Sequence, residues 1–157
     1  MAKADFSQEI RHCVSDDMHP DIRIVACTRN IQSGRFIGSN LAVAFNNRGN
    51  AYYFNGQLDR AIEDYGDAIR LQPDFAEAFS NRGNVYRKEG QFDRAIEDYD
   101  KALHFEPDNA QAFADRGLAY EKKGEAIQAL RDFNKAYALG FRHPLLLKRL
   151  RESGVLL

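Results

Sequence analysis

Apolar residues recur along much of the chain at the spacing of one face of an α-helix. In residues 44–56 one stripe carries small and aromatic side chains and ends at a glycine: Ala44, Phe45, Gly49, Tyr52 and Gly56. In residues 58–73 a second stripe ends before a proline: Ala61, Ile62, Tyr65, Ala68, Ile69 and Pro73. No repeat segment alternates with the period of two typical of a β-strand. The pattern predicts two helices joined by a turn.

This two-helix pattern repeats every 34 residues. NRGNAYY at 47–53 returns as NRGNVYR at 81–87 and as DRGLAYE at 115–121. Residues 42–75 and 76–109 are identical at 20 of 34 positions, which chance does not produce. The sequence therefore predicts a stack of similar helix pairs.

Each first helix contains a glycine, although glycine in a helix costs about 1 kcal/mol relative to alanine. We expect close packing against the second helix to compensate, in the pairs Gly49–Ala61, Gly83–Ala95 and Gly117–Ala129. We expect the recurring aromatic residues to fill the core: Phe45, Phe79, Phe113, Tyr52, Tyr86, Tyr120, Tyr65, Tyr99 and Phe133. Arginines and aspartates also recur, and they predict bridges within pairs or between neighbouring repeats: Arg48, Arg82, Arg116, Asp64, Asp98 and Asp132.

The 34-residue period, with aromatic, Gly, Tyr, Ala and Pro residues at fixed offsets, resembles the tetratricopeptide repeat (TPR) family over residues 42–143. The third unit departs from the pattern, because it has Phe141 where the others have Pro73 and Pro107. The resemblance implies an all-α, right-handed superhelical solenoid of antiparallel helix pairs with about nine helices. The expected organisation is a degenerate N-terminal helix pair, three repeats, and a capping helix with an apolar tail: 1–41, 42–75, 76–109, 110–143 and 144–157.

The only two cysteines, Cys13 and Cys27, lie on the two helices expected in the degenerate pair. Antiparallel neighbours can bring them into disulfide range, but two buried thiols fit equally well. The pair resembles the N-terminal portion of some bacterial TPR proteins. A disulfide would favour a periplasmic or secreted protein after signal removal, and free thiols would favour the cytoplasm. No metal site is expected, because the histidines show no ligand spacing: His12, His19, His104 and His143.

The charges nearly balance, with 22 Lys and Arg against 23 Asp and Glu. General binding to nucleic acid is therefore disfavoured. No apolar stretch approaches the roughly 18 residues of a membrane helix, so we expect a soluble chain. Nucleophile motifs and phosphate-binding loops are also missing, so neither an enzyme nor a cofactor is expected.

The resemblance to TPR proteins implies a protein-interaction scaffold that binds an extended peptide or short helix in a concave groove. By repeat phase the predicted groove residues are Asn46, Asn50, Tyr53, Phe54, Asn81, Asn84, Arg87, Lys88, Gln111, Leu118 and Lys122. Asn50 and Asn81 match two positions of the carboxylate clamp of chaperone-binding TPR domains. The cationic positions of that clamp are not matched, which disfavours binding of an acidic chaperone C-terminus: Asn46, Gln111 and Asp115.

Self-assembly is the alternative function. The apolar tail 155–157 could enter the groove of a second copy, which would make the protein a homo-oligomer. The ends also differ in charge, because residues 42–109 carry 8 basic and 13 acidic residues, whereas residues 110–157 carry 9 and 5. Such polarity favours head-to-tail stacking. The sequence leaves the partner, the pathway and the compartment open.

Overall fold

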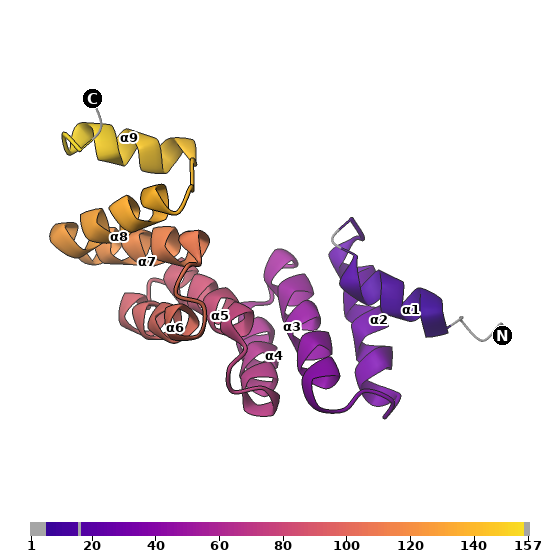
Figure 1. Ribbon diagram of the computed structural model, residues 1–157. Coiled ribbons are helices and arrows are strands. Elements are labelled where there is room, and N and C mark those ends of the chain that lie inside the picture. The colour runs from indigo at the N-terminus through magenta and orange to yellow at the C-terminus, as the bar shows by residue number, and fades with distance from the viewer. Residues whose placement is uncertain (1–5, 16, 156–157) are drawn as a thin grey trace. The chain divides into compact units, whose positions relative to one another are not determined.

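The computed structural model describes residues 6–15 and 17–155, which form nine α-helices and no strands. This confirms the predicted all-α class. In chain order the helices are α1 (Phe6–Val14), α2 (Pro20–Gln32), α3 (Gly38–Phe54), α4 (Leu58–Leu71), α5 (Ala76–Lys88), α6 (Phe92–Phe105), α7 (Ala110–Lys123), α8 (Ala126–Ala138) and α9 (Pro144–Glu152) (Figure 1). Two compact units divide within α5, between Val85 and Tyr86, and each is considered separately below. None of the described helices has the length and apolar character needed to cross a membrane.

Helices α2 and α9 begin with the same pair of residues, a histidine followed by a proline. Pro20 and Pro144 occupy the first turns of α2 and α9, where the missing N–H of proline costs no hydrogen bond. The preceding histidines, His19 and His143, accept hydrogen bonds from backbone N–H groups of those turns. A histidine–proline pair therefore fixes where both helices begin.

The first unit packs α3 against α4 through small residues and one large ring. Ala61, Tyr65 and Val85 form a buried cluster, with partly buried Tyr52 and Tyr53 packed against it. A second cluster joins α3, α4 and α5 through alanines: Ala42, Ala68 and Ala78. These helices approach each other closely because alanine occupies the points of contact.

Gly49 contacts the ring of Tyr65. A Cβ at Gly49 would lie 2.7 Å from Cε1 of Tyr65, so this ring occupies the space that the glycine leaves. Ala61, the expected partner, lies in the same buried cluster as this ring. At Gly117 a Cβ would lie 2.6 Å from Cε1 of Phe133 and 3.2 Å from the carbonyl oxygen of Ala129, which is the expected partner there.

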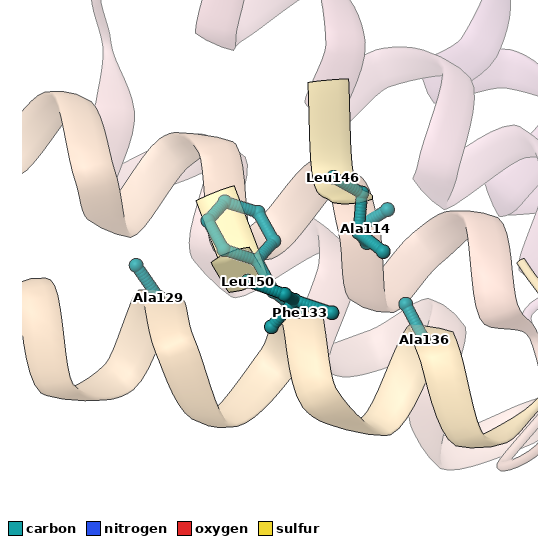
Figure 2. Close-up of a cluster of buried hydrophobic side chains, with 6 residues drawn as sticks. All are labelled: Ala114, Ala129, Phe133, Ala136, Leu146 and Leu150. Carbon is teal, nitrogen blue, oxygen red and sulfur yellow. The ribbon is translucent and has the colours of Figure 1, made fainter. Parts of the chain in front are cut away.

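In the second unit, α9 packs against α8. Figure 2 shows Leu146 and Leu150 gathered with Phe133 and three alanines in one cluster. Leu150 is fully buried, and Phe141 packs against the same cluster from the connection between α8 and α9. The leucines of α9 thus cover an apolar surface of α8, as the sequence predicts.

Two of the predicted arginine–aspartate bridges lie within single units. Nε and Nη2 of Arg48 donate to the two carboxylate oxygens of Asp64 at 2.8 Å each. Burial raises the pKa of Asp64, while the bond from Arg48 acts in the opposite direction. Arg116 makes the same forked contact with Asp132 at 2.7 and 2.8 Å.

The same arginines also reach the preceding helix pair. Nη1 of Arg116 donates to Asp100 at 2.6 Å, and Nη1 of Arg48 donates to the hydroxyl of Thr28 at 3.1 Å. The equivalent of Asp100 in the first repeat is Gly66, and a Cβ there would lie 3.9 Å from Nη1 of Arg82. Arg48 and Arg116 therefore each bond to their own helix pair and to the pair before it.

Candidate peptide-binding site

A hollow of about 610 Å³ opens in the first unit. Five predicted groove residues line it: Asn50, Tyr53, Phe54, Asn81 and Asn84. The other lining residues, which repeat phase did not assign to the groove, are Met18, Pro20, Arg23 and Tyr65. The site therefore combines first-helix residues of two repeats with the N-terminal helix pair and one ring of α4.

Tyr65 fixes the orientation of the Asn50 side chain. The Tyr65 hydroxyl donates to Oδ1 of Asn50 at 2.7 Å. Burial strongly raises the pKa of Tyr65, so the phenol keeps its proton and remains a donor at neutral pH. Because the amide oxygen faces Tyr65, Nδ2 of Asn50 is the atom left to donate to a ligand.

A second chain of hydrogen bonds orients Asn81. Nδ2 of Asn81 donates to Oδ1 of Asn46 at 3.1 Å, and Nδ2 of Asn46 donates to Oε1 of Glu77 at 2.9 Å. The carboxylate of Glu77 can only accept, which sets the direction of both bonds. The Asn81 amide therefore has its oxygen left to accept from a ligand.

Asn46 does not face the groove, in contrast to the prediction. Its side chain is 1% exposed, because Glu77 and Asn81 of α5 both bond to it. Asn46 thus links Asn81, which lines the hollow, to Glu77.

The aromatic residues at the end of α3 differ in exposure. The rings of Tyr53 and Phe54 meet edge to face at 5.5 Å, and Phe54 is 69% exposed. Phe54 therefore brings an exposed apolar ring to the lining of the hollow, which is suited to cover part of a bound chain.

A second hollow of about 330 Å³ lies in the second unit, between α7, α8 and α9. It contains the predicted groove residues Gln111 and Leu118 among ten lining residues. Its one carboxylate is Asp115, which accepts from Gln111 at 2.8 Å and from Arg87 at 3.3 Å. Burial raises the pKa of Asp115, and these two neighbours act to lower it.

The remaining predicted groove residues are basic. Arg87 donates to the hydroxyl of Tyr99 at 3.3 Å as well as to Asp115, so its guanidinium is held within the second unit. Lys88 and Lys122 are exposed on the last turns of α5 and α7.

Cys13 and Cys27 form a disulfide that ties α1 to α2. Their Cα atoms are 4.8 Å apart, within the range that a disulfide requires, and both residues are buried. Among residues 6–15 and 17–155, no group of three or more His, Cys, Asp or Glu side chains is placed to hold a metal ion.

Comparison with known proteins identifies the repeat. A family model described as the TPR repeat matches residues 49–88 and 83–124. No curated protein sequence matches the chain.

Solved structures with the same fold include three TPR proteins. The first TPR of Spaghetti (RPAP3), bound to the HSP90 peptide SRMEEVD, is 23% identical with a TM-score of 0.71, over 77% of this chain and 96% of that chain. MamA is 27% identical with a TM-score of 0.67, and the match covers 86% of this chain and 66% of that chain. The second TPR domain of human RPAP3, in complex with the HSP70 peptide SGPTIEEVD, is 28% identical with a TM-score of 0.66. This match covers 71% of this chain and 92% of that chain. TPR domains serve as protein–protein interaction modules, and with its helix pairs, its matched repeats and these neighbours this chain is a tetratricopeptide-repeat protein with several repeats.

Proposed function

We propose that this protein is an interaction scaffold that binds an extended peptide segment of a partner protein in the hollow of the first unit. The observation that carries the proposal is the fixed polarity of two amides on its wall. Asn50 has an N–H group left to donate, and Asn81 has a carbonyl oxygen left to accept. A peptide group supplies one acceptor and one donor, so the two side chains complement a peptide backbone of any sequence.

The peptides bound by the RPAP3 domains end in EEVD, and they are poor candidates for this chain. The chain has Asn46, Gln111 and Asp115 where the carboxylate clamp needs cations. Asn46 is buried, and Asp115 is itself a carboxylate. We therefore expect SGPTIEEVD to bind much more weakly than a peptide selected on this protein.

Selection of a peptide provides the test. A phage library of random twelve-residue peptides is selected on the full chain, and one recovered peptide is labelled with fluorescein for anisotropy titration. Asn50→Asp keeps the acceptor for Tyr65 but removes the donor, so affinity should fall about 5- to 30-fold, since one hydrogen bond contributes about 1–2 kcal/mol. Asn40→Asp makes the same chemical change at an exposed residue of α3 outside the hollow, so it is the matched control and should bind normally.

The same experiment addresses self-assembly. If no peptide is recovered, and the protein instead forms larger species as its concentration rises, a structural role replaces the peptide-binding one. Val155 is exposed on the apolar tail, and Leu156 and Leu157 lie outside the described residues. Deleting residues 155–157 should then abolish the larger species.

A further inference from the structure

One wall of the hollow in the first unit comes from the N-terminal helix pair. Met18 lies in the connection between α1 and α2, Pro20 begins α2, and Arg23 follows within its first turn. All three fall between Cys13 and Cys27 in the sequence. The segment that supplies the wall is therefore the segment that the disulfide closes into a ring.

The disulfide is part of the buried apolar packing of this helix pair. The buried apolar cluster between α1 and α2 consists of the two cysteines and Ala26 among the described residues. The cluster around α9, by comparison, has six buried residues, with seven partly buried ones packed against it. The disulfide supplies two of the three residues of this cluster, so it restrains how α1 lies against α2.

We propose that residues 18–23 are a functional wall of the peptide site and that the Cys13–Cys27 disulfide holds this wall in its binding geometry, so that full peptide affinity requires the oxidised chain. This inference rests on the proposed function. Reduction by a dithiol such as dithiothreitol transfers two electrons and two protons to the disulfide, which yields two thiols and the cyclic disulfide of the reagent. The ring then opens, and α1 remains joined to α2 only through the backbone of the connection between them.

The wall also adds an apolar requirement for the partner. Met18 and Pro20 bring apolar side chains to a hollow whose other lining includes Tyr53 and Phe54. A bound segment therefore meets apolar surface from the N-terminal pair and from α3, while Asn50 contacts its backbone. The partner is an extended peptide with an apolar side chain next to the peptide group that the asparagines contact.

The test compares oxidised and reduced full chain with fluorescein-labelled dodecapeptides. Selections are run in parallel on both forms, so that neither form is favoured by the choice of probe. We expect peptides from the oxidised chain to lose at least 10-fold in affinity on reduction, and the double variant Cys13→Ser, Cys27→Ser to bind like the reduced chain. Far-UV circular dichroism checks that reduction leaves the helices in place.

A substitution at Met18 tests the wall without reduction, in case reduction unfolds α1 and α2. Met18→Ala in the oxidised chain should weaken binding 3- to 10-fold. Val25→Ala is the matched control, because Val25 is also on α2 but lines a different hollow, and it should change affinity less than 2-fold. If the oxidised, reduced and Met18→Ala proteins bind the peptide equally well, residues 18–23 are not part of the peptide site. If Asn50→Asp still weakens binding in that case, the proposed peptide site itself is supported. If Asn50→Asp also leaves the peptide affinity unchanged, the proposed function is wrong as well.

Discussion

Replacing Gly49 by alanine tests how closely α3 approaches α4. The new Cβ would lie 2.7 Å from Cε1 and 2.9 Å from Cδ1 of Tyr65, whereas carbon atoms pack at about 3.5–4.0 Å. The ring has little freedom to move away, because Tyr65 is 1% exposed and its hydroxyl is bonded to Asn50. The two helices must separate or the ring must leave its position.

The expected change in the free energy of unfolding combines one favourable contribution with two unfavourable ones. Alanine is favoured over glycine inside a helix by about 1 kcal/mol, and overpacking of a core costs about 1–3 kcal/mol. Displacement of the ring would also weaken the bond to Asn50, at about 1 kcal/mol. We expect Gly49→Ala to lower the free energy of unfolding by about 1–3 kcal/mol.

Gly66 provides the matched control on α4 in the same unit. A Cβ there meets only Nη1 of Arg82, at 3.9 Å, so Gly66→Ala should raise the free energy of unfolding by up to about 1 kcal/mol. Urea denaturation followed by circular dichroism measures both variants against the parent. The contact between Gly49 and Tyr65 is refuted if Gly49→Ala is as stable as Gly66→Ala.

Three other predictions follow from the contacts described. Gly66→Asp should place a carboxylate near Arg82 and stabilise the protein by about 0.5–1 kcal/mol, a gain seen in the urea midpoint and reduced in 1 M NaCl. Opening the disulfide by Cys13→Ser with Cys27→Ser should cost about 2–3 kcal/mol in the first unit, measured by hydrogen exchange in α1 and α2. Burial raises the pKa of Asp115 above 3.8, so this carboxyl favours folding below pH 3.8 and loses that contribution as pH rises through the folded-state pKa. NMR titration should show the raised pKa, and Asp115→Asn should remove this part of the pH dependence.

The repeat made the helices and most core positions predictable, because residues 34 apart occupy equivalent places. It did not identify the atom that faces each position. Gly49 is small as expected, and the three heavy atoms nearest to the Cβ that it lacks all belong to the ring of Tyr65. Periodicity defines the face of a helix, whereas the partner across the interface depends on side-chain length and direction.

Asn46 shows the same limit at the candidate site. Repeat phase places it on the groove side of α3, and the neighbouring α5 buries it because Glu77 and Asn81 both reach its amide. Met18, Pro20 and Arg23 were missed for another reason: the N-terminal pair has diverged from the repeat, so no equivalent position in another unit indicated a role in the groove.

Tyr65 links the stability of the first unit to its candidate binding chemistry. Its ring fills the space left by Gly49, and its hydroxyl orients the Asn50 amide that we propose as a ligand contact. The sequence indicates the first role, because an aromatic residue recurs at this position in every full repeat. The second role depends on Asn50, and the third repeat has Leu118 and Phe133 at the two equivalent positions, which cannot form this hydrogen bond. In the first repeat the recurring aromatic position therefore makes a polar contact as well as a packing contact, because Asn50 accepts a hydrogen bond from the phenol of Tyr65.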